Sequence, residues 1–108
     1  MNLVLVDTSV WISHFRKRSP VLQALLSADQ VLCHPMVLIE LACGTPPAPR
    51  ERTLSDLRQL RSATVTSTEE TLALIEREQL QDAGCGAVDL FLLGSALLTS
   101  GAVLWTMD

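Results

Sequence analysis

Aromatic residues are scarce in this chain. Tyrosine is absent, and Phe and Trp together make up 4% of the 108 residues. Proteins that bind single-stranded nucleic acid on an open surface stack successive bases on exposed rings. The composition therefore argues against a base-stacking platform. Hydrophobic residues make up 48% and charged residues 19%, which is enough apolar material for a folded core and too little charge for disorder.

Paired cysteines are also lacking. The three cysteines, Cys33, Cys43 and Cys85, show no CxxC spacing and follow no secretory leader. This pattern predicts reduced thiols in a cytoplasmic protein. A zinc site needs pairs of ligands at short spacing, and the adjacent Cys33 and His34 are the only such cluster in the sequence. We expect these two side chains to pack at the end of a strand instead.

No hydrophobic run is long enough for a membrane span. The longest, 90-LFLLGSALL-98, is far shorter than the roughly 20 residues that a spanning helix needs. The opening MNLVLVDTSVWI has no positively charged start and is interrupted by Asp7, so it does not resemble a signal peptide. We therefore expect a cytoplasmic protein with no membrane partner.

Negative charge dominates only one half of the chain. The net charge is −4, which by itself disfavours binding to nucleic acid. Residues 1–61 nevertheless hold seven of the eight cations and five acids, whereas residues 62–108 hold one cation and seven acids. The cations cluster at 16–18 and between 50 and 61. Such clusters fit either two solvated helix ends or a surface that follows phosphates, and the sequence leaves both open.

Short apolar strands alternate with helical segments along the chain. Apolar and β-branched runs predict strands at residues 2–6, 31–33, 63–66 and 102–105. Helical spacing and capping residues predict helices at 10–17, 20–28, 35–43, 50–61, 68–82 and 88–99, the first of them capped by Ser9. This alternation predicts an α/β fold with a central parallel sheet flanked by helices on both faces, formed by one domain over residues 1–108.

Four carboxylates stand in apolar sequence without a neighbouring cation. Asp7 and Asp108 follow predicted strands, and Glu40 and Asp89 interrupt apolar helices that have no basic residue at the i±3 and i±4 positions. A buried carboxylate without a partner costs several kcal/mol. For any one acid, a distant Arg or solvent could offset this cost. Four such acids together favour a shared divalent cation at the carboxyl edge of the sheet. Clustered oxygen ligands suit Mg²⁺ or Mn²⁺.

Four blocks of the sequence resemble successive blocks of PIN domains, and most closely those of the VapC-type toxins of bacterial toxin–antitoxin pairs. They are VLVDTSVWI, PMVLIELACG, GCGAVDLFLLGSALL and LWTMD, which together span essentially the whole chain. The resemblance implies the toxin of such a pair, a metal-dependent endoribonuclease that hydrolyses RNA phosphodiesters with a water activated by Mg²⁺ or Mn²⁺. Family members usually continue past the last acid with a helix and often a strand. We therefore expect the C-terminal element to be missing and the activity to be reduced.

The same resemblance assigns roles to particular residues. It implies a catalytic cluster of Asp7, Glu40, Asp89 and Asp108, in which Asp7 and Asp89 are the principal metal-binding residues. Behind these acids, Thr8, Ser9 and Thr106 are plausible hydrogen-bond donors, although helix capping or strand-end bonding fits these hydroxyls equally well.

The resemblance also implies two protein partners, a second copy in a homodimer and a cognate antitoxin. A feature of the sequence points to an interchain surface as well. The apolar residues at 10–12, 15 and 21–26 exceed what one helix needs to bury in so small a domain. We therefore expect part of this surface to face another chain.

Other α/β proteins fit less well. Phosphatases of the haloacid dehalogenase type have a second Asp two residues after the first, and position 9 is Ser; receiver domains need an acidic pair and a late Lys. No P-loop or dinucleotide loop is present. We expect His14 to be a surface residue rather than a general base. The remaining alternative is a catalytically impaired PIN-like module that only binds an antitoxin, and the intact set of four acids argues for the enzyme.

Overall fold

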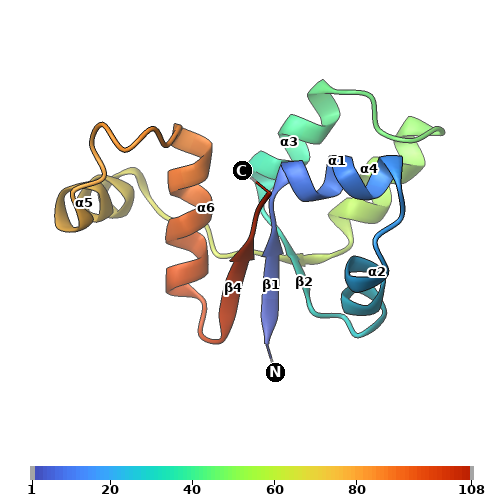
Figure 1. The fold of residues 1–108 in the computed structure, drawn as a ribbon, viewed down its shortest axis with the longest axis horizontal. Helices are drawn as coiled ribbons and strands as arrows, with labels where there is room; N and C mark the ends of the chain where they lie inside the picture. Colours follow the sequence, from blue (N-terminus) through green and yellow to red (C-terminus); the bar gives the residue numbers. More distant parts are fainter. Residues whose placement is uncertain (1, 108) are drawn as a thin grey trace.

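A four-stranded parallel sheet forms the centre of the structure, a computed structural model that describes residues 2–107. Its strands are β1 (Leu3–Val6), β2 (Val31–Cys33), β3 (Arg61–Ser62) and β4 (Ala102–Trp105), in the order β3-β2-β1-β4 (Figure 1). In the register, Val4 of β1 lies opposite Val31 on one side and Val103 on the other. Because β1 is a central strand, the residue that follows it lies in the middle of the carboxyl edge.

Within residues 2–107, six helices cover both faces of the sheet. On one side lie α1 (Thr8–Arg16), α2 (Pro20–Ser27), α3 (Pro35–Cys43) and α4 (Arg50–Arg58), and on the other α5 (Thr68–Glu78) and α6 (Ala87–Leu98) (Figure 1). Leu5 and Val6 are successive residues of β1 that point to opposite faces, and both are fully buried. The predicted α/β fold is therefore confirmed. None of the described helices combines the length and the apolar character needed to cross a membrane.

The surface of α1 and α2 differs from the prediction. Most of its apolar side chains belong to the core or pack against it: Val10, Trp11, Phe15, Leu22, Leu25 and Leu26. Ile12 and Val21 remain exposed, at 41% and 63%. The surplus is smaller than expected, because the sheet and the neighbouring helices use most of these side chains, and the prediction that part of this surface faces another chain is left to the exposed Ile12 and Val21. The homodimer itself stays a prediction.

The third strand is shorter and earlier than predicted. It comprises Arg61–Ser62 rather than 63–66, and α4 ends at Arg58 rather than at 61. Pairing with β2 stops where the Ala63 amide donates to the carbonyl of Cys33 at 3.1 Å. The apolar pattern at 63–66 arises because Ala63 and Thr66 turn into the interior after the strand has ended.

Two helix ends also differ from the predictions. The first helix begins at Thr8 and is capped by Asp7, not by Ser9. The fifth helix ends at Glu78 rather than at 82, because Gln79 adopts a left-handed conformation with φ of 54°. The first difference matters for function, because it places a carboxylate at the junction between β1 and α1.

Candidate active site

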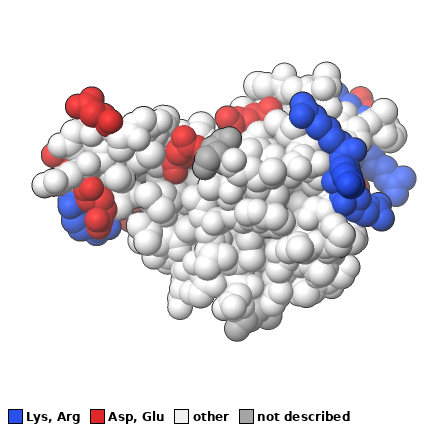
Figure 2. Space-filling view, viewed as in Figure 1, with Lys and Arg blue, Asp and Glu red and all other residues white. Residues whose placement is uncertain are grey.

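The three predicted acids that lie in the described chain share one end of the fold. Asp7 directly follows β1, Glu40 lies in the helix that follows β2, and Asp89 lies in the first turn of α6. The carboxyl ends of the strands, α3 and the start of α6 face the same rim of the molecule (Figure 1). Acidic side chains are visible over α3 and over the start of α6, away from the main group of cations (Figure 2). We call Asp7, Glu40 and Asp89 the acidic rim.

Asp7 is held by donors from two distant parts of the sequence. Its Oδ1 accepts from the Thr8 amide at 2.7 Å, which caps α1. Its Oδ2 accepts from the Ser9 hydroxyl at 2.9 Å and from the Thr106 hydroxyl at 2.7 Å. The residue is only 5% exposed. The three donors stabilise a buried carboxylate and fix its orientation.

Ser9 connects this network to the segment after β4. Its hydroxyl donates to Asp7 and accepts from the Met107 amide at 3.1 Å. Residues 106 and 107 are therefore tied to the start of α1 by two hydrogen bonds that join positions almost a chain length apart. Asp108, the fourth predicted acid, lies outside the described residues.

Glu40 joins the rim through Thr8. The Thr8 hydroxyl donates to Glu40 Oε1 at 2.6 Å, which connects the first turn of α1 to α3. Thr8 thus lies between the two carboxylates: its amide donates to Asp7 and its hydroxyl donates to Glu40. Contact between α1 and α3 therefore brings together two acids that are 33 positions apart in the sequence.

Among residues 2–107, Asp89 is hydrogen-bonded only to the N-cap of its own helix. Its Oδ2 accepts from the Gly86 amide at 3.2 Å, an N-terminal bond of α6. No hydrogen bond among residues 2–107 joins it to Asp7 or Glu40. The structure thus places Asp89 on the expected edge of the sheet without linking it to the other two acids.

The sequence suggested that the acids of the rim are buried without partners and therefore need a cation, but the structure shows this burial for only one of them. Asp7 is buried, but Glu40 and Asp89 are exposed, so the expected cost of burying them without a partner is absent. Among residues 2–107, no three His, Cys, Asp or Glu side chains come close enough to hold a metal ion together. What favours a cation here is the placement of these acids and their free oxygens.

The donor chemistry of the rim fits a hard cation. A carboxylate has about four acceptor positions on its two oxygens. Asp7 Oδ1 accepts one hydrogen bond, and within the described chain Glu40 Oε2 and Asp89 Oδ1 accept none. Each acid thus keeps an oxygen lone pair for Mg²⁺ or Mn²⁺, or for a water bound to it.

Two histidines are occupied elsewhere. His14 Nδ1 accepts from the Ser19 amide at 3.0 Å, and burial, together with the nearby Arg18, lowers the pKa of His14. His34 is 1% exposed and caps α3 by accepting from the Met36 amide at 3.0 Å. These contacts support a structural role for both. No bond among residues 2–107 brings either imidazole to the acidic rim.

The adjacent Cys33 is also structural. Burial raises the pKa of its thiol to about 11, so it stays protonated at neutral pH and is a poor zinc ligand. Its thiol hydrogen bonds to the carbonyl of His34 at 3.8 Å. Cys33 and His34 therefore pack at the end of β2, as predicted.

Sequence reasoning missed two features of the site. Its hydroxyl residues were found, but the part played by the Met107 amide was not, because a backbone donor leaves no mark in a residue pattern. The second is a cavity beside Glu40, between α1 and residues 44–47. The only signal for it was the stiff stretch 45-TPPAP-49 directly after α3.

Known proteins resemble this chain in sequence. The chain matches the PIN domain family over residues 4–108. It is 45% identical over 106 residues to Ribonuclease VapC32 of Mycobacterium tuberculosis, strain CDC 1551 / Oshkosh, and equally to the protein of that name in strain H37Rv. Each alignment covers 98% of this chain and 85% of the relative. The chain therefore belongs to the PIN domain family and is a VapC-type member of it.

Proposed function

We propose that this protein is a metal-dependent endoribonuclease, the toxin component of a toxin–antitoxin pair. The single observation that carries the proposal is the network around Asp7. In it, residues 8, 9 and 106 donate hydrogen bonds to one buried carboxylate, and the Thr8 hydroxyl also donates to Glu40. A chain of the PIN family that is 45% identical to a ribonuclease has this network at the carboxyl edge of its sheet.

Asp7 and Asp89 are the proposed holders of Mg²⁺ or Mn²⁺, directly or through bound water. Glu40 and Asp108 are proposed to complete the group of residues around the metal ion by orienting those waters. A divalent ion bound there would polarise a phosphodiester oxygen and lower the pKa of a water molecule.

The chain's own residues prepare the site. Ser9 and Thr106 both occupy Asp7 Oδ2, which leaves acceptor capacity mainly on Oδ1. The Thr8 hydroxyl holds Glu40 Oε1 in the same way and leaves Oε2 available. Fixing the carboxylates in advance reduces the reorganisation needed when a cation and a phosphate arrive.

The proposed partners follow from the family. We propose an RNA substrate, a cognate antitoxin whose cationic side chain enters the acidic rim, a homodimer, and a cytoplasmic location. A cationic group among these carboxylates would relieve their mutual repulsion and compete with the metal ion. This provides a physical route by which an antitoxin inhibits the enzyme.

Cleavage of single-stranded RNA by the purified protein tests the proposal. We expect cleavage with Mg²⁺ or Mn²⁺, none with EDTA, and none for Asp7→Asn with either metal. Arg77→Gln, a change at an exposed cation of α5 outside the rim, serves as the control for folding and purity. A folded wild-type protein that binds its antitoxin and cleaves no RNA with either metal would contradict the proposal and favour the binding module.

A further inference from the structure

A cavity of about 430 Å³ opens directly beside the acidic rim. It lies between α1, α3 and residues 44–47, and Glu40 is one of its lining residues. Pockets for small ligands typically measure roughly 300–1,000 Å³. The space is therefore of a size for one nucleotide, and it shares a wall with the candidate active site.

The wall opposite α1 is held in place by α4. Arg50 donates to the carbonyls of Ala42 at 2.6 Å and Gly44 at 3.4 Å, and Thr53 donates to the carbonyl of Pro47 at 2.8 Å. These bonds tie the loop after α3 to the start of α4. The cavity is thus a built feature of the fold.

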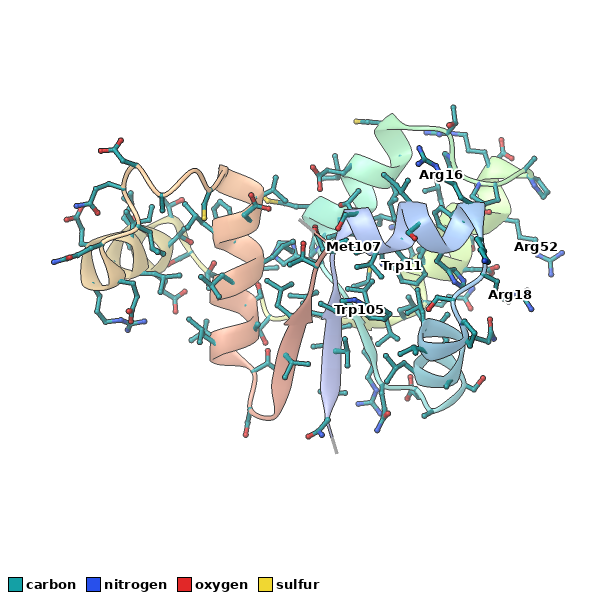
Figure 3. All side chains as sticks on the ribbon, in the orientation of Figure 1. Trp11, Arg16, Arg18, Arg52, Trp105 and Met107 are labelled. Atoms are coloured by element: carbon teal, nitrogen blue, oxygen red, sulfur yellow. The ribbon has the colours of Figure 1, made fainter. Side chains whose placement is uncertain are left out.

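Besides the Glu40 carboxylate at the rim, its lining combines apolar surface with one cation. Ile12, Phe15, Pro46 and Pro47 supply the apolar part. Arg16 lies at the end of α1, where its side chain points toward the loop that joins α3 to α4 (Figure 3). Within residues 2–107 its guanidinium takes part in no ion pair or hydrogen bond. An exposed cation without a protein partner beside an apolar wall suits a ligand that has both an anionic and a flat apolar part.

More cations continue away from the cavity. Lys17 and Arg18 follow Arg16 in the sequence, and Arg52 lies on α4. They gather at the end of the molecule formed by α1 and α4, on the far side of the cavity from the start of α6 (Figures 1 and 2). The described part of the chain therefore presents a path from carboxylates, through an apolar cavity, to a positively charged surface.

We propose that this cavity binds one base of a single-stranded RNA next to the cleaved phosphodiester, with Arg16 on an adjacent phosphate. The inference rests on the proposed function and names a specificity pocket for it. Single-stranded RNA can turn a base out of its stack, whereas a base within a duplex cannot reach such a pocket. One enclosed base also agrees with the scarcity of aromatic residues, which excludes a platform for several bases.

The test uses two substitutions with matched controls. Thr45→Trp fills the cavity from an exposed loop position, and Ser55→Trp places the same ring on the exposed face of α4. Arg16→Gln removes the cation of the cavity, and Arg77→Gln removes the same charge from the exposed side of α5, outside the positively charged surface of α1 and α4. Binding of a fluorescein-labelled, single-stranded RNA of random sequence is measured in EDTA. Base preference is read by sequencing the products of cleavage with Mg²⁺.

The two cavity variants should differ from their controls in distinct ways. Thr45→Trp should weaken RNA binding roughly tenfold and alter the base preference at one position beside the cut. Arg16→Gln should reduce the slope of log affinity against log salt by about 0.7, the contribution of one phosphate of a single strand. Ser55→Trp should keep the wild-type base preference, and Arg77→Gln should keep the wild-type salt slope.

Other results would overturn the inference without touching the proposed function. If the wild type cleaves RNA and Thr45→Trp retains its affinity and base preference, the cavity holds no base. If Thr45→Trp instead loses only the binding of a protein partner, the cavity holds a peptide. Absence of cleavage by the wild type would refute the proposed function itself, and RNA binding in EDTA by the wild type and Thr45→Trp still reports on the cavity.

Discussion

Two neighbouring strands of the sheet end in the same way but lead to different chemistry. Asp7 follows β1 and caps α1, whereas His34 follows β2 and caps α3. Both side chains are buried, at 5% and 1% exposure. The Asp7 carboxylate has three donors, while His34 accepts one amide with Nδ1, and its Nε2 has no partner in the described chain.

The origin of the donors distinguishes the two junctions. His34 satisfies only the helix that it caps. Asp7 also receives a hydroxyl from Thr106, 99 positions away, and Ser9 binds it while holding the Met107 amide. One helix cap needs a single acceptor, so the additional donors serve the carboxylate itself. We therefore interpret the β1–α1 junction as functional and the β2–α3 junction as structural.

The largest expected effect is the contrast between Asp7→Asn and His34→Asn. Asp7→Asn removes the charge and keeps the size, so RNA cleavage with Mg²⁺ should fall by more than about 100-fold, beyond the effect of supporting residues. His34→Asn keeps a capping oxygen and leaves a cavity, so cleavage should persist while stability falls by about 1–3 kcal/mol. Cleavage rates and urea unfolding measure the two effects. Equal loss of cleavage in folded forms of both variants would contradict the distinction.

A second contrast separates the two proposed metal-binding residues. Asp89 is exposed and accepts one hydrogen bond from a backbone amide, which the side-chain oxygen of Asn can also accept. Asp89→Asn should therefore reduce cleavage by at least roughly tenfold and leave the unfolding midpoint unchanged. Asp7→Ala should reduce both, because three donors lose their acceptor at a cost of about 1–3 kcal/mol. A stability loss for Asp89→Asn equal to that for Asp7→Ala would remove the difference between them.

The sequence predicted the sheet and the edge on which the acids lie, for physical reasons that the structure supports. The strands 31–33 and 102–105 were found because two residues mark their ends: Pro35, whose ring restricts φ, and Gly101, which tolerates the left-handed φ of 76° that the turn before β4 requires. The strand at 61–62 was misplaced because it pairs through its backbone, and its exposed side chains carry no apolar pattern.

The candidate site was predictable in its members but not in its contacts. An acid inside an apolar helix suggested burial, yet Glu40 lies on the exposed side of α3. Helical periodicity cannot show which neighbour a side chain meets, and the Thr8 bond depends on how α1 packs on α3. For Thr106 the sequence left a bond to the acids and strand-end bonding equally open, and the structure shows the bond to Asp7.

A smaller effect should come from Thr106→Val, which removes one donor of Asp7 and preserves the shape of the side chain. We expect cleavage to fall about tenfold, because Asp7 loses part of its fixed orientation. Thr99→Val is the matched control, since the Thr99 hydroxyl makes a bond of similar length to the Ser95 carbonyl within α6. Steady-state cleavage of a short RNA compares the two variants. Similar rates for both would show that the Thr106 bond only fastens the segment after β4.

The smallest expected effect concerns pH and the structural junction. Burial lowers the pKa of His34 below its ordinary value of 6.5. The unfolded chain therefore binds a proton that the folded chain does not, and stability should fall as the pH drops from about 6.5 toward the folded pKa. The slope from this group cannot exceed about 1.4 kcal/mol per pH unit. Cys33 and Arg58 line the space beside His34. Burial raises the pKa of Cys33 to about 11, so its thiol stays protonated over this range.

Urea unfolding between pH 5 and 8 isolates this contribution. The wild type should lose more stability toward pH 5 than His34→Asn does, so the gap between the two curves should narrow at low pH, and above pH 7 the curves should run parallel, with His34→Asn the less stable. His14 also has a lowered pKa, caused by burial and by Arg18, so His14→Asn is measured alongside to separate the two imidazoles. Curves for the wild type and His34→Asn that stay parallel down to pH 5 would mean that His34 takes up a proton as readily in the fold as in the unfolded chain. The junction after β2 would then tolerate a charge as the junction after β1 does, and the contrast between them would rest on the donors of Asp7 alone.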